Sequence, residues 1–182
     1  MALLLFFFLT ILIAPPTSSV VIPSPLKSSY QSISGQRAIN LDVNVRLLTV
    51  LALQQSGWQL YEDHWYKLFE TDLMWIPAEN VCRSMGGHLV SIKDESENLF
   101  VHKLRKKNNV WIGLNKLNDT FQVYKWSDGT EADYLNWDSS QPNEPEVDCA
   151  YMAFHQEQRG TWFDYGCREM LPQFFVCELP MT

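Results

Sequence analysis

The sequence predicts an α+β domain with two helices, short β-segments and one long irregular loop. Apolar residues recur at helical spacing in two stretches, residues 78–85 and 94–107. Beyond these stretches the chain turns into short β-rich segments that Gly, Asn, Asp and Pro separate. The 22 residues between Trp126 and Cys149 show almost no strand pattern, and so long a loop in a compact domain usually either has a function or is disordered.

The composition fits one folded domain with a short extension. The chain has 182 residues, of which 46% are hydrophobic and 13% aromatic, enough to build a core and to exclude a mainly disordered protein. Its formal net charge is -7. Nucleic acids and anionic membranes bind through basic protein surface that replaces counterions, so neither is expected as a partner.

The N-terminus has the pattern of a secretory signal peptide, expected to cover residues 1–19. Residues 3–14 form an apolar run of 12 residues, too short to span a bilayer. Thr17 and Ser19 are small enough to precede a cut before Val20. We therefore expect a secreted, extracellular protein without a membrane span after cleavage. No Lys or Arg precedes the apolar run, so a retained N-terminal anchor is the alternative.

Residues 20–56 are expected to form a linker or neck before a folded domain at residues 57–182. Ser and Pro are frequent in residues 20–36, which lack the apolar surface to order themselves. In residues 39–53 apolar side chains first alternate and then fall at helical spacing, so periodicity does not define the element. It is either an oligomerising neck or a strand leading into the domain. A neck is disfavoured because its helical part makes only about one heptad.

The first clear helix contains four apolar residues that repeat at i, i+3, i+4 and i+7, namely Ala78, Val81, Cys82 and Met85. Pro77 is tolerated in a first turn, and Gly86-Gly87 ends the element. Cys82 therefore lies on the buried face.

The second helix is expected at residues 94–107. Asp94 and Glu97 resemble a capping box at its start. Basic residues gather at its end and complement the helix dipole, namely Lys103, Arg105, Lys106 and Lys107. Three residues are expected to face inward: Phe100, Val101 and Leu104.

The β-rich segments follow at residues 110–114, 122–126, 149–154 and 174–177. The long loop between the second and the third carries seven acids and no base: Asp128, Glu131, Asp133, Asp138, Glu144, Glu146 and Asp148. Such a segment repels itself unless a cation joins it, and its side-chain oxygens suit a hard ion such as calcium. An acid-rich loop without any ligand is the alternative.

The tripeptide Gln141-Pro142-Asn143 lies within this acidic loop. Pro142 fixes the local backbone, so the two amide side chains can be held in a set relation and aimed at a ligand. Together with the acids they predict a surface that binds a metal ion and hydroxyl groups. Earlier in the chain, Asn118 starts an Asn-Asp-Thr sequence that is an acceptor for N-glycosylation in a secreted protein.

Four cysteines form an even set: Cys82, Cys149, Cys167 and Cys177. In a secreted chain they are expected to form two disulfides and leave no free thiol. Zinc is the rival use, but separations of 67, 18 and 10 residues include none of the close pairs that structural zinc sites favour.

A series of landmarks follows in order along the chain: Trp75, Ala78, Cys82, Gly86-Gly87-His88-Leu89, Trp111-Ile112-Gly113-Leu114, Trp126-Ser127-Asp128-Gly129, Asn136-Trp137, Gln141-Pro142-Asn143, Asp148-Cys149, Gly160-Thr161-Trp162-Phe163-Asp164, Cys167 and Phe175-Val176-Cys177-Glu178. In this order they resemble a C-type lectin domain. The resemblance covers about residues 57–179 and is more specific for the fold than for sugar binding. It implies two helices with small antiparallel sheets, and a core position for Trp111, Trp126 and Trp162.

The resemblance also implies that Cys82 pairs with Cys177 and Cys149 with Cys167. Many relatives carry a further N-terminal cysteine pair, one member of which would fall near Trp65. Both members are missing here, so an N-terminal hairpin would have to be held by aromatic packing.

In the resembled family a calcium ion is held by the outer residues of such a tripeptide and by nearby acids. Matching positions give Gln141, Asn143 and Asp164, with Glu146 or Glu144 standing in for an acid that Val147 replaces. Phe163 replaces a further ligand, an Asn. The expected metal ligands are Gln141, Asn143, Glu146 and Asp164, and Glu144 joins them in binding the ligand. They supply about four or five of the six to eight oxygens that Ca²⁺ prefers, which predicts weak, roughly millimolar binding.

These expectations favour a secreted carbohydrate-binding module that is weakly Ca²⁺-dependent and recognises a carbohydrate or glycoprotein. The alternative is a Ca²⁺-independent module of the same fold that binds a protein or lipid, which the apolar Val147 and Phe163 favour. No nucleophile with a partnering base is readable, so no catalytic residue is assigned and the chain is not expected to be an enzyme. Hydrolysis by the paired acids Glu144 and Glu146 is a third, weaker hypothesis.

Overall fold

The computed structural model describes residues 41–117, 119–154, 160–168 and 172–181. The expected signal peptide, the Ser- and Pro-rich segment and the glycosylation acceptor Asn118 lie outside these residues. Residues Thr49–Thr182 form one compact unit. Within the described residues, no helix has both the length and the apolar character that a membrane span needs.

Residues 41–55 are helical, so the alternative that this segment forms a strand is wrong. The alternating apolar residues at its start are exposed, and no strand of the described sheet pairs with them. At its other end Val50 and Leu53 pack against the core, and the carbonyl of Leu53 accepts from the backbone N–H of Trp58 at 3.0 Å. The boundary of the folded domain at residue 57 stays a prediction.

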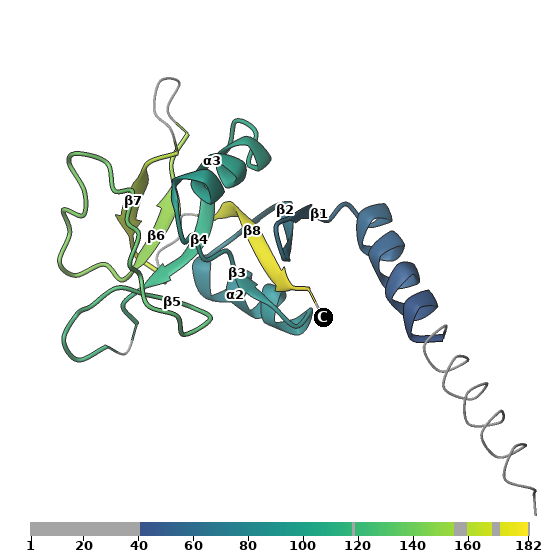
Figure 1. The fold of residues 1–182 in the computed structure, drawn as a ribbon. Coiled ribbons are helices and arrows are strands. Elements are labelled where there is room, and N and C mark those ends of the chain that lie inside the picture. The colour runs from purple at the N-terminus through teal and green to yellow at the C-terminus, as the bar shows by residue number, and fades with distance from the viewer. Residues whose placement is uncertain (1–40, 118, 155–159, 169–171, 182) are drawn as a thin grey trace, which may run out of the picture. The chain divides into compact units, whose positions relative to one another are not determined.

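The strands join into one sheet of eight strands, in which β8 (Gln173–Pro180), from the end of the chain, lies between two earlier strands (Figure 1). The order is β1 (Gln59–Tyr61), β2 (His64–Leu73), β8, β4 (Val110–Asn115), β6 (Cys149–Met152) and β7 (Trp162–Tyr165). β3 (His88–Leu89) pairs with β8, and β5 (Lys125–Trp126) pairs with β4. The resemblance implied small antiparallel sheets; most described strand pairs are antiparallel, but they belong to one sheet in which β8 runs parallel to β4.

Aromatic packing holds the N-terminal hairpin of β1 and β2. Trp58 contacts Phe69 edge-on, with ring centroids 6.2 Å apart, and Phe69 stacks on Phe175 of β8 at 4.9 Å. Trp65 is 2% exposed at the position near which many relatives carry a cysteine. Rings therefore take the place of the missing disulfide, as the sequence predicts.

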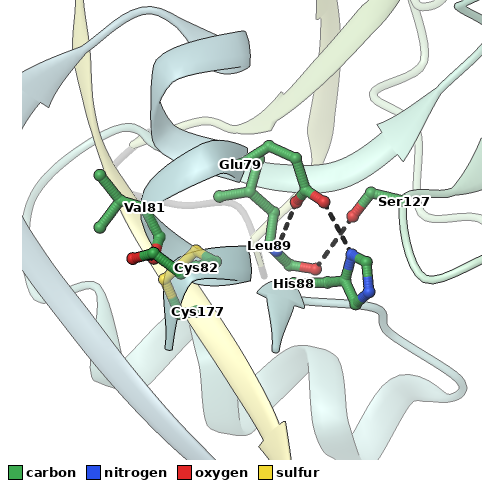
Figure 2. Close-up of a disulfide and its surroundings, with 8 residues drawn as sticks. Glu79, Val81, Cys82, His88, Leu89, Ser127 and Cys177 are labelled. Carbon is green, nitrogen blue, oxygen red and sulfur yellow. Dashed lines mark hydrogen bonds and ion pairs between the residues drawn. A yellow bond between two sulfur atoms is a disulfide. The ribbon is translucent and has the colours of Figure 1, made fainter. Parts of the chain in front are cut away.

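Helix α2 (Trp75–Ser84) packs on the sheet through Ala78 and Cys82, which are fully buried as predicted. Val81 is partly buried, whereas Met85, which was predicted to lie on the same face, follows the helix and is 37% exposed. Cys82 is joined to Cys177 of β8, the pairing that the resemblance implies (Figure 2). Beside this disulfide the carboxylate of Glu79 accepts from the backbone N–H of Leu89 at 2.9 Å and lies 2.7 Å from Nδ1 of His88. These contacts tie α2 to β3.

Gly86 and Gly87 end α2 for two different reasons. Gly86 has a φ of 89°, which residues with a side chain rarely adopt. Any Cβ on Gly87 would overlap the backbone carbonyl of Glu178 in β8. The second glycine therefore allows the chain after α2 to pass close to the central strand.

Helix α3 (Glu95–Leu104) begins as predicted, because the side chain of Asp94 accepts from the backbone N–H of Glu97 at 2.9 Å. The carboxylate of Glu97 accepts from Lys93 N at 2.8 Å and from the hydroxyl of Tyr66 at 2.6 Å. Burial raises the pKa of Glu97. The start of α3 is thus anchored to β2.

The end of α3 differs from the prediction. The helix stops at Leu104, so Arg105, Lys106 and Lys107 of the predicted basic end follow it, and Arg105 is fully buried. Its guanidinium donates to the carbonyl of Asn108 at 2.8 Å and lies over the ring of Phe154 at 5.3 Å. Of the expected inward residues, Val101 and Leu104 are buried, while Phe100 is partly buried and stacks on Tyr61 at 4.4 Å.

The core contains Trp111, Trp126 and Trp162, each no more than 3% exposed, in the role that the sequence predicts. The indole N–H of Trp162 donates to the side-chain oxygen of Asn98 in α3 at 2.9 Å. The expected strand at residues 122–126 is reduced to the two residues of β5. The second disulfide joins Cys149 to Cys167.

Candidate functional site

Part of the long acidic loop (residues 127–148) lies beside the edge strand β7 and pairs with it through one isolated bridge, between Trp137 and Trp162 (Figure 1, green). The backbone N–H of Trp162 donates to the carbonyl of Asn136 at 2.8 Å, and the N–H of Asp138 donates to the carbonyl of Trp162 at 3.0 Å. The side chain of Asp138 is buried and accepts from the N–H and hydroxyl of Ser140. The loop is therefore attached to β7 directly before the Gln-Pro-Asn loop (residues 141–143).

Asp164 of β7 lies at the centre of the candidate site and is 5% exposed. Its carboxylate accepts from the backbone N–H of Asn143 at 3.3 Å and from that of Glu144 at 3.0 Å. In return, the backbone N–H of Asp164 donates to Oε1 of Gln141 at 3.3 Å. The peptide bond between Gln141 and Pro142 is cis. The structure thus brings together Gln141, Asn143, Glu144 and Asp164.

Three of the oxygens expected to bind calcium are therefore already hydrogen-bond acceptors. Oε1 of Gln141 and both carboxylate oxygens of Asp164 hold the loop to the strand. A metal ion bound to these oxygens would compete with backbone N–H groups, and buried N–H groups without an acceptor are costly. These three hydrogen bonds hold the loop against β7 without a metal ion.

Two positions of the expected metal site carry apolar side chains instead of oxygen ligands. Val147 is 4% exposed and has no side-chain oxygen, and its backbone N–H donates to the carbonyl of Glu144 at 3.2 Å. The ring of Phe163 stacks against Tyr151 of β6, with centroids 5.8 Å apart. The side chains of Glu144 and Glu146 are exposed, and no hydrogen bond or ion pair among the described residues joins Glu146 to Asp164.

The donor set does not fit a calcium site of the kind that the resemblance implies. Among the residues that the structure describes, no three His, Cys, Asp or Glu side chains lie close enough together to hold a metal ion. The two amide side chains of the loop add neutral oxygens, but that of Gln141 is already in use. The side chains of Gln141, Asn143 and Asp164 alone offer fewer oxygens than the six to eight that Ca²⁺ prefers.

Lys116 supplies a cation to the acidic loop from outside it, although no sequence pattern points to this residue. It follows β4 and is only 6% exposed. Its ammonium donates to the carbonyl of Pro145 at 2.7 Å, and its backbone N–H donates to the carbonyl of Asp148 at 2.8 Å. The ammonium also lies 5.5 Å from the centre of the Tyr124 ring. The loop thus meets a fixed positive charge of the protein itself.

Tyr124 lies near the ammonium of Lys116 and is affected by the charges of Asp164 and Asp148. Burial, with smaller contributions from Asp164 and Asp148, raises the pKa of Tyr124, so its side chain is a neutral phenol. Its ring packs edge-on against Trp137 at 5.0 Å, and its hydroxyl is buried without a hydrogen-bond partner among the described residues. The surroundings of this ring therefore include one ammonium and the hydrogen-bonded carboxylate of Asp164.

Comparison with known proteins agrees with this fold. The family model of the Lectin C-type domain matches residues 71–179. One chain of the snaclec coagulation factor IX/factor X-binding protein of Trimeresurus stejnegeri is 38% identical over 133 residues, which cover 68% of this chain and 82% of that protein. Lectin BRA-3 of Megabalanus rosa is 30% identical over 150 residues, covering 80% and 91%.

Among solved structures, a calcium-independent type II antifreeze protein is similar at a TM-score of 0.61 and 28% identity, covering 69% of this chain and 93% of that one. The chain is therefore similar to this family in structure as well as in sequence. With residues 71–179 fitting the family model, the chain belongs to the C-type lectin domain family.

Proposed function

We propose that this chain is a secreted recognition module that binds its ligand without a calcium ion at the Gln-Pro-Asn loop. One observation carries the proposal: Gln141 and Asp164 hold the loop by hydrogen bonds to backbone groups, so the loop has a fixed conformation without a metal. The buried ammonium of Lys116 supports the same conclusion, because it provides positive charge where the acids gather. The expected signal peptide and the two disulfides support secretion.

The ligand class that the surface favours is a protein with a basic patch. Four acids of the long loop are exposed, namely Glu131, Asp133, Glu144 and Glu146, and Leu135 adds exposed apolar surface among them. Complementary charge speeds association and selects against acidic partners. The snaclec relative is named for binding coagulation factors, which supports protein recognition as a use of this fold.

The test restores the two ligands that the chain lacks. The parent is expected to unfold at the same temperature in millimolar Ca²⁺ and in EDTA. The double variant Phe163→Asn with Val147→Glu is expected to gain calcium-dependent stability, about 2.7 kcal/mol at a hundredfold excess over its dissociation constant. The matched control, Phe163→Leu with Val147→Leu, has no new oxygen and is expected to gain none. Stabilisation of the parent by millimolar Ca²⁺ would contradict the proposal.

A second candidate is weakly Ca²⁺-dependent carbohydrate binding through Gln141, Asn143, Glu146 and Asp164, with Glu144 contacting the sugar. It is favoured by the proximity of Gln141, Asn143 and Asp164 and by a relative that is named a lectin. Calcium would then have to displace the loop's hydrogen bonds to Asp164. A glycan array read in Ca²⁺ and in EDTA tests it: signals that require Ca²⁺ and vanish in Asn143→Ala support this candidate, and a blank array in both conditions removes it.

A further inference from the structure

A cavity lies where the end of β8 meets β2 and β3, and we call it the β3 cavity. Glu178 of β8 lies opposite Tyr66 of β2 on one side and opposite His88 of β3 on the other. His64 lies two residues before Tyr66 in β2, so its side chain projects from the same face of the sheet. The cavity has a volume of about 280 Å³, and its lining includes His64, Gly86, Gly87, His88, Asp128 and Glu178.

The two histidines of the lining are hydrogen-bond acceptors at Nε2. Nδ1 of His88 lies 2.7 Å from the carboxylate of Glu79 (Figure 2). Nδ1 of His64 lies 2.8 Å from the carboxylate of Asp63. An ionised carboxylate only accepts hydrogen bonds, so each Nδ1 carries the hydrogen. The other ring nitrogen, Nε2, is then an acceptor in each neutral imidazole.

Oε1 of Glu178 adds an acceptor that is only weakly satisfied. The residue is 7% exposed, and its Oε1 lies 3.5 Å from the hydroxyl of Tyr66 and 3.6 Å from Nε2 of His64. Tyr66 has a single hydroxyl hydrogen, and the carboxylate of Glu97 is the closer acceptor for it, at 2.6 Å. Because Nε2 of His64 is itself an acceptor, it and Oε1 of Glu178 face each other without a hydrogen between them.

Ser91 shows the same excess of acceptors over hydrogens beside the cavity. Its hydroxyl oxygen lies 2.8 Å from Oδ2 of Asp128 and 2.8 Å from Oε2 of Glu178. A serine hydroxyl has one hydrogen, so it can donate to only one of these carboxylates at a time. The described lining contains no lysine or arginine that would neutralise the two acids. A ligand that brings both hydrogens and positive charge would supply what the cavity lacks.

An organic cation fits this arrangement better than a metal ion. In the part of the chain that the structure describes, no three His, Cys, Asp or Glu side chains are close enough to hold a metal. The acceptors come from β2, β3, β8 and the long loop, so they are spread around the cavity. A guanidinium spreads its charge over a plane with five N–H donors, whereas an ammonium has three donors on one atom. The volume is slightly below the roughly 300–1,000 Å³ of drug-sized sites, which suits a single side chain.

We propose that the β3 cavity receives the guanidinium of an arginine side chain from a protein ligand. Glu178 and Asp128 pair with its charge, and Nε2 of His64 and of His88 accept further N–H groups. The inference deepens the function proposed above and rests on it for one point, namely that the ligand is a protein with a basic patch. The cavity shares no residue with the Gln-Pro-Asn loop.

The test titrates the full chain with acetyl-arginine amide, which mimics an arginine residue within a protein. EDTA is present throughout, and the pH is about 8, where an ordinary imidazole is neutral. NMR follows the imidazole C–H resonances of His64 and His88, each assigned by its absence in His64→Gln or His88→Gln. We expect both resonances to shift in a saturable way.

Two matched ligands define what the cavity recognises. Acetyl-citrulline amide has nearly the same shape but no charge, so it is expected to bind at least about tenfold more weakly. Free arginine carries a carboxylate that the acids of the lining repel, so it is expected to bind about threefold more weakly. Free arginine that binds as tightly as the amide would overturn the assignment to a protein-borne side chain.

Two variants test the carboxylates. Glu178→Gln removes the buried charge and is expected to weaken the binding of acetyl-arginine amide about tenfold. Asp128→Asn alters an exposed side chain and is expected to weaken it about threefold, and it covers the case in which Glu178→Gln fails to fold. The matched control Asp72→Asn changes an exposed acid near the other end of β2 and is expected to keep the affinity.

The proposal is overturned if acetyl-arginine amide shifts neither histidine, or if acetyl-citrulline amide binds as tightly. It is also overturned if Asp128→Asn binds as tightly as the parent, or no more weakly than Asp72→Asn. Because calcium is absent throughout, these outcomes leave the calcium independence of the Gln-Pro-Asn loop untouched. Conversely, stabilisation of the parent by Ca²⁺ would contradict the proposed role of the loop without changing the shifts measured here.

Discussion

The Gln-Pro-Asn loop and the β8 cavity differ in how their polar groups are satisfied. The β8 cavity is an opening at the start of β8 that is lined by Asp72, Asn108, Asn109, Pro172, Gln173 and Phe174. At the loop, Oε1 of Gln141 and both carboxylate oxygens of Asp164 accept backbone hydrogen bonds. Beside the β8 cavity, both polar atoms of the Gln173 amide are buried and have no partner in the described part of the chain. The loop carries the residues that a family resemblance selects, and its hydrogen-bonding groups are paired internally, whereas the buried amide beside the cavity is not paired by any described residue.

The difference follows from where each residue lies in the sheet. β7 is an edge strand, and the loop beside it has backbone N–H groups that need acceptors once they are buried. Asp164 and Gln141 meet that need. Gln173 lies at the start of β8, between β2 and β4, where regular pairing with β2 is interrupted between Phe69 and Leu73. No described residue reaches the amide of Gln173 at this point.

The largest effect is expected from Asp164→Ala, which removes the acceptor that holds the loop. The backbone N–H groups of Asn143 and Glu144 would lose their partner, so we expect a loss of about 3 kcal/mol in the free energy of unfolding. Urea denaturation measures this loss, and hydrogen exchange at the two N–H groups shows whether the loop has been released. The β8 cavity should be unaffected.

The matched control for this loss is Glu146→Ala. Glu146 is an exposed acid of the same loop, so its removal should change stability by less than about 0.5 kcal/mol. Equal effects of the two variants would mean that the hydrogen bonds of Asp164 do not hold the loop, and the contrast between the two sites would disappear.

A smaller loss, about 2 kcal/mol, is expected from Lys116→Met. The change keeps most of the side-chain volume but removes the donor to the carbonyl of Pro145 and the only buried ammonium seen at the acidic loop in the described residues. The loop acids would then repel one another without a nearby cation. The loss measured in urea should shrink in about 1 M NaCl, where the screening length is only about 3 Å. A loss that is independent of salt would assign Lys116 a packing role alone.

The sequence predicted those features that depend on local spacing. Asp94 caps α3 because a capping box needs only neighbouring residues, and Cys82 lies on the buried face of α2 because helical spacing defines that face. The core position of Trp162 and the disulfide pairing came from a resemblance, and both agree with the structure.

The features that the sequence could not predict depend on contacts between distant segments. Lys116 meets Pro145 across 29 positions, and no local pattern joins the two. The resemblance grouped Asp164 with Asn143 and Glu144, but it did not predict that the carboxylate accepts their backbone N–H groups, 21 and 20 positions away. Gln173 could not be selected either, because an unpaired amide becomes visible only when its neighbours are known. Arg105 was predicted as part of a basic helix end because its charge complements the helix dipole, and its burial could not be read from that pattern.

A gain in stability is expected from Gln173→Met in the absence of ligand. Methionine has nearly the same length and no polar atom that requires a hydrogen bond, so the cost of the unpaired amide is removed and the free energy of unfolding should rise by about 1 kcal/mol. Thermal unfolding of Gln173→Met and of the exposed control Gln59→Met measures it. Stability at or below that of the parent would show that the amide is satisfied in solution, which would weaken the contrast with the loop.

The smallest expected effect is a pH dependence near the β8 cavity. Burial, and after it the neighbouring charge of Arg105, lowers the pKa of His102, whose Nδ1 lies 2.9 Å from that guanidinium. Burial lowers the pKa of Arg105 to about 10, so it stays charged at neutral and acidic pH. Because His102 binds its proton less readily when folded, its contribution to stability is complete above its unfolded pKa of about 6.5 and is lost as the pH falls through its folded pKa. Protonated His102 would repel Arg105, which holds the carbonyl of Asn108 in the cavity wall.

The variant His102→Gln keeps an acceptor for Arg105 but cannot titrate, so its stability should fall less than that of the parent between about pH 7 and pH 5. The stability curves of the parent and of His102→Gln must be compared with each other. Burial raises the pKa of Glu97, so protonation of Glu97 stabilises the folded state over part of the same acidic range. Hydrogen exchange should locate the difference near Asn108 and leave the N–H of Asn143 unchanged once both variants are corrected for intrinsic exchange. A difference that appears at Asn143 instead would place the acid sensitivity in the Gln-Pro-Asn loop, and the loop would then be the less firmly held of the two sites.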